Sequence, residues 1–281
     1  MEHLAARLDF LCASQNADGG WGYFPCKQSW LEPTVYAALA LVGTPEAAGR
    51  ATRAWNLVRS WQNPDGGWRP SAKVAVSTWG TALAVTFSDA LGRRGPEIDR
   101  GTEWLLAAAG AESSMLNRVL RFFGASAVER EVKYAGWPWR PDTSAWVEPT
   151  AHSLVALKKV AVRKPGRAIS ARIDSGERML LGVRCADGGW NYGSPRALGI
   201  ELPSYAETTA LALLGFDDRA PAGALDRARQ LLAGATSPLA RAWLRLALGY
   251  PPLEAPLSGN DVQLCALEAL DFRLLRPGVR T

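Results

Sequence analysis

The chain has little cysteine and little histidine. Its 281 residues include four cysteines and two histidines, and no two cysteines form a C-x-x-C pair. Disulfide frameworks and finger-type zinc sites depend on clustered cysteines and histidines, so the sequence predicts free thiols and no metal site. No motif indicates a cofactor either.

Long apolar runs are also missing. No stretch approaches the roughly 20 uninterrupted apolar residues that a membrane-spanning helix needs. The first fifteen residues interleave charged and apolar side chains, unlike the continuous apolar run of a signal peptide. We therefore expect a cytoplasmic protein without a transmembrane segment.

Strong charge of one sign is absent as well, because the net charge is only +5. The longest run of one sign comprises Lys158, Lys159, Arg163, Lys164, Arg167 and Arg172. These cations offer contact with a diphosphate or with an anionic membrane surface, but a helix end followed by a linker explains them equally well. We expect no nucleic-acid partner.

What the sequence does contain is one heptad in three versions: QNADGGW at 15–21, QNPDGGW at 62–68 and RCADGGW at 184–190. The paired glycines permit a tight reversal, the Asp can bond its own turn, and the Trp can pack over the helix just ended. A catalytic loop is needed once, whereas a brace is needed in every repeat. The recurrence therefore favours a structural role.

Helical patterns alternate around these heptads. Long amphipathic stretches are predicted at 3–15, 51–62, 97–109, 170–183 and 223–233. Short Ala-rich segments start at Glu32, Ser77, Glu148, Glu207, Leu239 and Asp261. Alternating helices with a period of roughly 45 residues must bury their apolar faces against neighbouring repeats, in an open solenoid or in a closed ring. Six short segments almost free of charge favour the ring, so we predict an all-α fold, an (α/α)6-type toroid with the Ala-rich helices inside.

We predict that residues 1–281 form a single toroid domain. Two segments depart from the regular repeat of helices. The segment YPPLEAPLSG at 250–259 is too rich in proline to supply the sixth outer helix. Residues 110–133 form an insertion that reads as an extra helix with an apolar stripe. It would cap the ring, flank a cavity entrance or meet a protein partner.

The pattern of Gln, Asp-Gly-Gly-Trp and a Thr-bearing helix that ends in Ala-Leu resembles a known repeat. It is similar to the QW-like prenyltransferase and squalene oxidase repeat of squalene and oxidosqualene cyclases and of protein prenyltransferase β subunits. The resemblance implies an α/α barrel whose central cavity is lined by apolar and aromatic side chains. The catalytic sets of these terpenoid cyclases and prenyltransferases do not carry over, because Gly215 stands where an Asp-x-Asp-Asp motif would begin and no His follows Cys265.

Alignment of the short segments on their Ala-Leu ends suggests where chemistry lies. It places Thr34, Thr78, Thr150 and Thr209 in one column. Two residues earlier stand the candidate catalytic acids Glu32, Glu148, Glu207 and Asp261, with Val76 in the second repeat. In a toroid these acids would ring one mouth, either as ordinary helix caps or as a desolvated proton donor beside an anionic partner.

Two residues after the Thr column the alignment places Tyr36, Gly80, His152, Leu211, Trp243 and Cys265. His152 is the candidate polar and catalytic group of the cavity, with a satisfied core histidine as the alternative. The aromatic residues would stabilise a cationic intermediate or fill the core. The predicted substrate-binding set is Tyr36, Trp79, Trp243, Cys265 and Arg241.

The leading functional hypothesis is a toroid that binds or transforms an isoprenoid-like apolar molecule in a central cavity of at least a few hundred cubic ångströms. Whether it is an enzyme stays open. One rival is a carbohydrate-active α/α toroid with paired rim carboxylates. The other is a non-catalytic helical-repeat scaffold that binds a protein or an anionic surface.

Overall fold

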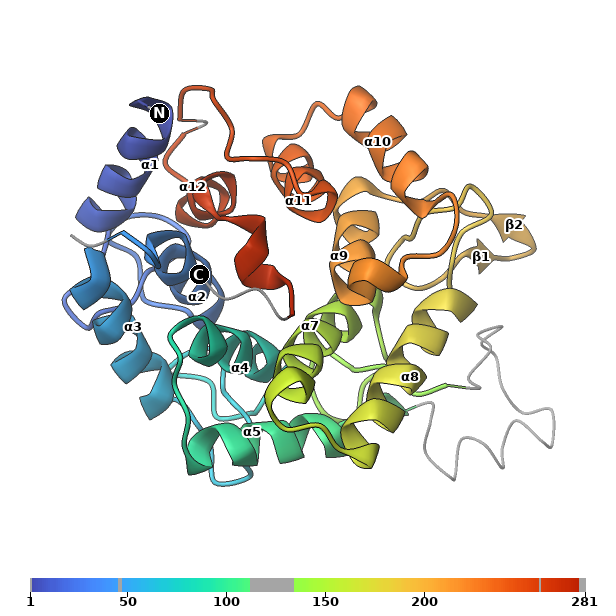
Figure 1. Ribbon diagram of the computed structural model, residues 1–281, viewed down its shortest axis with the longest axis horizontal. Coiled ribbons are helices and arrows are strands. Elements are labelled where there is room, and N and C mark those ends of the chain that lie inside the picture. The colour runs from blue at the N-terminus through green and yellow to red at the C-terminus, as the bar shows by residue number, and fades with distance from the viewer. Residues whose placement is uncertain (1, 45–46, 112–133, 258, 278–281) are drawn as a thin grey trace.

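The computed structural model describes residues 2–44, 47–111, 134–257 and 259–277, so most of the predicted insertion at 110–133 lies outside the described residues. Six helices form an inner ring: α2 (Leu31–Leu41), α4 (Gly80–Ala90), α7 (Val147–Arg163), α9 (Ala206–Phe216), α11 (Pro238–Leu248) and α12 (Val262–Ala269). Each packs against the next, and α12 packs against α2, which closes the ring (Figure 1).

Longer helices cover the outside: α1 (Glu2–Ala13), α3 (Ala48–Ser60), α5 (Pro96–Ala107), α8 (Arg167–Gly182) and α10 (Ala224–Gly234). Each contacts two inner helices. The predicted all-α toroid is confirmed, and the only strands in the described part are the exposed pair β1 (Arg196–Ala197) and β2 (Ile200–Glu201). None of the described helices is both long and apolar enough to cross a membrane.

Composition separates the two layers. Every residue of α2 except Glu32 is buried, as expected for an Ala-rich helix with neighbours on all sides. In α8 the buried residues run from Ile169 to Leu180 mostly at three- and four-residue steps, so one face meets the ring and the other meets solvent. The layers approach closely at Gly101, where a Cβ would stand 2.4 Å from the Trp68 ring.

The sixth outer position holds no helix within the described residues of 250–259, as the prolines predict. Two buried arginines bond this extended segment instead. Arg7 pairs with Glu268 at 2.9 Å and donates to the Leu253 carbonyl at 3.0 Å. Arg245 donates to the Tyr250 carbonyl at 3.0 Å. Because an extended chain cannot bond its own carbonyls as a helix does, these guanidinium groups replace the missing helical bonds.

The Asp-Gly-Gly-Trp loops fasten each outer helix to the following inner helix. In all three, the indole N–H donates to the carbonyl ten residues earlier: Trp21 to Leu11, Trp68 to Val58 and Trp190 to Leu180, at 2.8, 2.9 and 2.7 Å. The backbone N–H of the same Trp donates to a Thr hydroxyl on the inner helix. We call each such loop a brace. The loop at Trp137 in the third repeat is also called a brace, because the backbone N–H of Trp137 donates to a Thr hydroxyl in the same way.

The Thr column aligned from the sequence is wrong in the second repeat. Trp68 donates to Thr81 Oγ1 at 2.8 Å, so Thr81 rather than Thr78 is the equivalent of the other threonines. The stretch STWGT offers two threonines three residues apart, and the Ala-Leu ends did not distinguish them. The correction puts Trp79, not Val76, at the mouth position that acids occupy in other repeats.

Each brace also reaches the preceding inner helix. The backbone N–H at the start of that helix donates a hydrogen bond to a carbonyl of the brace. This carbonyl belongs to the residue two positions after the brace Trp. The donor–acceptor pairs are Val262–Tyr23 (2.9 Å), Leu31–Pro70 (2.8 Å), Trp79–Trp139 (3.1 Å) and Val147–Tyr192 (3.1 Å). Four of the six junctions of the inner ring are therefore linked by backbone hydrogen bonds of this kind. The two junctions on either side of α11 have none within the part of the chain described.

The middle of the ring is occupied by the short 3-10 helix η4 (Phe272–Leu275) (Figure 1). Leu274 and Leu275 are 5% and 3% exposed. Residues 272–276, which we call the plug, enter at the mouth formed by the C-terminal ends of the inner helices. The space left at the centre by the described residues is about 10 Å³, at the lower limit for one water molecule. The described residues therefore do not enclose the central cavity of a few hundred cubic ångströms that the sequence led us to expect.

Candidate functional site

The opposite mouth, formed by the N-terminal ends of the inner helices, gathers the predicted acids. Glu32, Glu148 and Glu207 lie in the first turns of α2, α7 and α9, and Asp261 caps α12. The acids act on one another electrostatically, because Glu32 and Glu207 raise the pKa of Glu148 and Asp261 raises that of Glu32. The sequence alignment thus found a real convergence of carboxyl groups.

Of the four acids at this mouth, Glu32 accepts the most hydrogen bonds among those described. Its Oε2 accepts from the Tyr23 hydroxyl at 2.8 Å, and its Oε1 accepts from the Gln263 side-chain amide at 2.8 Å. Burial raises the pKa of Glu32, whereas both donors oppose that rise because they stabilise the ionised form. Of the acids at this mouth, Glu32 is thus the one whose ionised form receives two side-chain hydrogen bonds, although burial leaves its pKa raised overall.

Glu148 carries no such donor among the described hydrogen bonds. Burial, followed by the fields of Glu32 and Glu207, raises the pKa of Glu148 to about 8. Neighbouring negative charge disfavours ionisation of Glu148, and none of the described hydrogen bonds stabilises its carboxylate form. Glu148 is consequently a carboxylic acid that stays neutral at pH 7.

Asp261 is engaged in local structure. Its Oδ1 accepts from the Leu264 backbone N–H at 2.9 Å, the bond of an ordinary N-cap. The capping alternative raised by the sequence therefore accounts for Asp261, and its charge acts on the mouth only from a distance.

An aromatic layer lies one helical turn below the acids. Tyr36 and His152 follow Glu32 and Glu148 by four residues, which places them on the same helix faces. The Tyr36 hydroxyl is 3.3 Å from His152 Nε2. The His152 ring centre is 5.1 Å from that of Trp79 and 6.0 Å from that of Trp243. Three of the predicted aromatic residues therefore surround the predicted histidine.

His152 is uncharged in this setting. The side chain is 5% exposed, and burial lowers its pKa to about 3. It thus offers a neutral imidazole at neutral pH and places no positive charge among the rings. Leu83 and Leu211 stand at the same level beside it, and Leu83 occupies the place that the alignment gave to Gly80.

Two predicted binding residues lie elsewhere. The Cys265 thiol donates to the Arg7 carbonyl at 3.7 Å, so it faces α1 rather than the ring centre. Arg241 is exposed and lines a groove of about 650 Å³ between the end of α10 and residues 250–254, beside the position without an outer helix. Neither joins the acids or the aromatic layer.

Sequence reasoning missed two residues of this mouth, Tyr23 and Trp139. Tyr23 bonds Glu32, and the Trp139 ring meets that of Trp79 edge-on with centres 5.2 Å apart. Both stand two positions after a brace Trp, at Trp21 and Trp137. That shared position was a signal in the sequence, because its carbonyl accepts a hydrogen bond from the start of the preceding inner helix.

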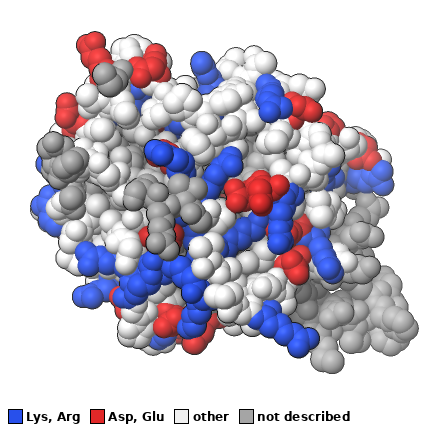
Figure 2. Space-filling model, viewed as in Figure 1, with Lys and Arg blue, Asp and Glu red and all other residues white. Residues whose placement is uncertain are grey.

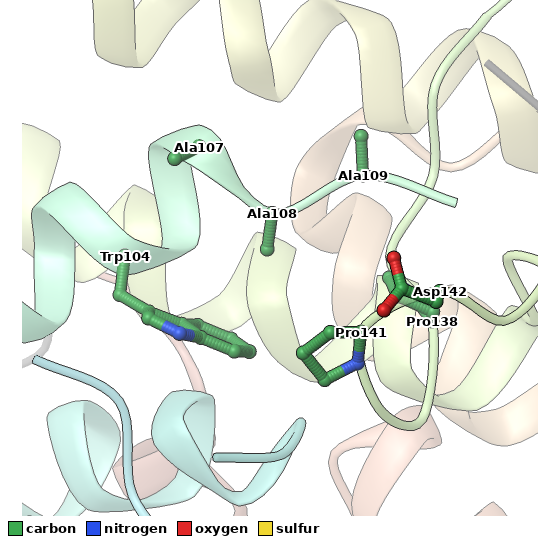
Figure 3. Close-up of a pocket in the computed structure, with 7 residues that line it drawn as sticks. All are labelled: Trp104, Ala107, Ala108, Ala109, Pro138, Pro141 and Asp142. Carbon is green, nitrogen blue, oxygen red and sulfur yellow. The ribbon is translucent and has the colours of Figure 1, made fainter. Parts of the chain in front are cut away.

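A separate pocket of about 260 Å³ lies outside the ring. Figure 3 shows Trp104, at the end of α5, across the pocket from Pro141, with Asp142 at its edge. It shares no lining residue with the acids or the aromatic layer. Within the described residues, no group of three His, Cys, Asp or Glu side chains has the arrangement of a metal site.

Comparison with known proteins yields partial sequence matches and broad structural ones. No protein-family model matches the chain. A drimenyl diphosphate synthase from Streptomyces showdoensis is 42% identical over 64 residues, which are 22% of this chain and 12% of that protein. The corresponding enzyme from Streptantibioticus cattleyicolor is 46% identical over 63 residues, 21% of this chain and 11% of that protein. The match thus spans about an eighth of the length of these relatives.

Solved structures of two kinds share the fold. The type II terpene cyclase MstE from Scytonema, in complex with geranylgeranyl dihydroxybenzoate, covers 97% of this chain and 77% of its own, with a TM-score of 0.58 and 16% identity. A family 8 endoglucanase from Klebsiella pneumoniae covers 96% and 98%, with a TM-score of 0.65 and 13% identity. The chain therefore has a terpenoid cyclase-like α/α toroid, a fold that glycoside hydrolases also use.

Proposed function

We propose that this chain is a terpenoid cyclase-like toroid that binds an isoprenoid-like apolar molecule at the acidic mouth and donates a proton to it from Glu148. One observation carries the proposal: a neutral carboxyl group stands one turn above a layer of aromatic rings that contains no fixed charge. The partial matches to drimenyl diphosphate synthases and the shared fold of a type II terpene cyclase support the same class of ligand.

The paired carboxyl groups suit proton donation. Burial favours the protonated form of Glu148. Tyr23 and Gln263 donate hydrogen bonds to Glu32 and so favour its ionised form. When Glu148 gives its proton to a carbon–carbon double bond, the carboxylate left behind and Glu32 both face the new carbocation. Their charges stabilise that cation where it forms.

The aromatic layer suits the carbocation that this proton transfer creates. The rings of Trp79, Trp243 and Tyr36 lie within 5.1 to 6.4 Å of the His152 ring, centre to centre. Aromatic faces attract cations, and none of these rings carries a positive charge that would repel a carbocation. The ionised acids at this mouth also disfavour an anionic group there, so the part of the ligand that binds beside Glu148 is uncharged.

Incubation with squalene, farnesol and farnesyl diphosphate, with mass spectrometry of the extracted products, tests the proposal. Wild type should cyclise or hydrate at least one neutral isoprenoid chain. Glu148→Gln should lower turnover by about a hundredfold or more while ligand affinity changes little, because the amide keeps the shape and loses the proton. Glu103→Gln, on the exposed face of α5, is the matched control.

Equal turnover by wild type and Glu148→Gln would refute the role of Glu148. Binding of isoprenoids without turnover by either protein would leave a binding scaffold and refute the catalytic step. Absence of both binding and turnover would refute the ligand class.

One observation favours a second candidate, a carbohydrate ligand. Tyr192 and Tyr205 are 56% and 42% exposed, with ring centres 5.5 Å apart, in the loops that precede α9 at the same mouth. Exposed aromatic rings beside paired carboxyl groups are features of glycoside-binding sites. Release of reducing ends from cello-oligosaccharides, lost in Glu148→Gln, would favour this candidate over the isoprenoid.

A further inference from the structure

The mouth opposite Glu148 has the reverse charge. Lys159 and Arg163 of α7 both pair with Asp89 of α4, at 3.3 and 3.2 Å, and Arg94 lies 3.9 Å from the same carboxylate. Three cations thus share one anion. Figure 2 shows Lys and Arg side chains gathered over the middle and lower part of this face. The run of cations singled out in the sequence supplies two members of this cluster, which we call the Asp89 cluster.

Lys159 is the buried member of the Asp89 cluster. It is only 3% exposed, and burial lowers its pKa although Asp89 lies beside it. Its second polar contact is with the plug, because its Nζ donates to the Arg276 carbonyl at 2.9 Å. An oxygen atom of the chain thus occupies the place beside Lys159 where an anionic oxygen would bind more strongly.

The apolar part of the plug fills the space next to this cluster. Leu275 meets a chamber whose other walls are aliphatic or small, apart from His152 at its far end: Leu83, Thr86, Ala151, Val155, Leu211 and Leu214. The plug therefore presents an apolar side chain to the chamber and an oxygen to a buried cation. An amphiphilic anion offers the same arrangement of an apolar chain beside an oxygen acceptor, with a negative charge on the oxygen.

The plug is attached to the ring by few polar bonds. Besides the Lys159 contact, Arg276 donates to the Ala247 carbonyl at 3.1 Å and lies 3.7 Å from Asp217. Its η4 turn has four residues and bonds only locally. Asp217 acts on Lys159 and Asp99 acts on Arg163, but Asp99 is itself paired with Lys164 at 2.9 Å. Once the plug leaves, four cations therefore face three carboxylates, and the mouth stays positive.

We propose that this basic mouth is a second binding site, for an amphiphilic anion whose chain takes the place of Leu275 and whose head group takes the place of the Arg276 carbonyl. The site goes beyond the proton donation proposed for the acidic mouth and does not depend on it. Binding displaces the plug from the centre of the ring.

Dodecyl phosphate, held below the concentration at which it forms micelles, is a suitable probe because it is not an isoprenoid. Titration calorimetry on the full chain should show binding, with dodecanol and inorganic phosphate each weaker by about tenfold or more. Trypsin should cut after Arg273 faster when dodecyl phosphate is bound, because the displaced plug becomes accessible. Inorganic phosphate should not change that cleavage rate.

Two variants with matched controls sharpen the test. Arg163→Gln should weaken dodecyl phosphate binding by about tenfold, whereas Arg167→Gln, an exposed residue of α8, should leave it unchanged. Leu275→Ala should strengthen binding by about tenfold, because less apolar contact must be given up, whereas Leu257→Ala at an exposed position should not.

Three results would overturn the proposal. Dodecyl phosphate binding with unchanged cleavage after Arg273 would mean that the plug stays in place. Equal effects of Arg163→Gln and Arg167→Gln would mean attraction to net charge only. Equal affinity for dodecyl phosphate and inorganic phosphate would mean that the chamber takes no chain. None of these results bears on turnover at Glu148, so the two proposals fail separately.

Discussion

The neutrality of Glu148 makes folding stability depend on pH in a defined direction. Burial raises its pKa from the usual 4.5 to about 8 in the folded chain. Below pH 4.5 the group is protonated in both the folded and the unfolded chain. Between pH 4.5 and about 8 the unfolded chain releases the proton and the folded chain keeps it, so the free energy of unfolding falls as pH rises.

The magnitude can be worked out from the same shift. One pKa unit corresponds to 1.36 kcal/mol, so the full interval from 4.5 to about 8 would give about 5 kcal/mol. The carboxyl group is partly exposed, and solvent screening reduces this to about 2 kcal/mol. Glu148→Gln cannot ionise, so it should gain about 2 kcal/mol relative to wild type between pH 5 and pH 8.

Urea unfolding of wild type and Glu148→Gln at pH 5 and at pH 8 measures this gain. Titrating groups that do not interact with Glu148 are common to both chains and cancel in the difference. Glu103→Gln, on an outer helix, serves as the control and should differ from wild type by the same amount at both pH values. If the difference between Glu148→Gln and wild type is also the same at both pH values, the carboxyl group is not neutral and the reasoning about the acid fails.

The braces and the contact between layers give two further predictions. Thr81→Val should lower the free energy of unfolding by about 1–3 kcal/mol, because it leaves the buried backbone N–H of Trp68 without an acceptor. Thr78→Val should lower it by less than about 1 kcal/mol. A larger loss for Thr78→Val than for Thr81→Val would contradict the corrected Thr column. Gly101→Ala should lower the thermal unfolding midpoint by several degrees, because the new Cβ would stand 2.4 Å from the Trp68 ring. Gly49→Ala is the control: it has open space around it and should be neutral or mildly stabilising. Equal shifts of the two midpoints in calorimetry would contradict the close approach of Gly101 to Trp68.

The fold was predictable because its signals are periodic. Three heptads, an Ala-rich inner pattern and an amphipathic outer pattern repeat along the chain, and each repeat adds the same information. The ambiguity at STWGT shows where that information ends. Thr78 and Thr81 are the same residue type in similar sequence surroundings, so the sequence does not distinguish them. The hydrogen bond from the Trp68 backbone N–H does.

The candidate site was predictable in part for a related reason. Glu148 and His152 were found because helix spacing puts residues four apart on one face. The plug was not predicted, because FRLL at 272–275 is too short to show a helical or strand periodicity. Its neighbouring residues in the sequence also carry no signal for where it packs. Its place depends on a contact between Lys159 and a carbonyl 117 residues away. Buried Arg7 and Arg245 were missed because arginine is rarely buried.

The uneven linking of the ring has a consequence for motion. Where a brace joins neighbouring inner helices, they cannot separate unless a buried backbone hydrogen bond breaks, so amide hydrogens there should exchange with solvent only in rare, large openings. Helix α11 has no such backbone bond at either of its junctions in the described structure, and its hydrogen bonds to the end of α12 come from one side chain, Arg245, which donates to the Leu267 and Leu270 carbonyls at 2.6 and 2.9 Å. Thermal fluctuation should therefore concentrate at α11, which also holds the plug through the Ala247 carbonyl. The ring can then exchange what fills its centre through one weak segment, while the rest of its circumference stays folded.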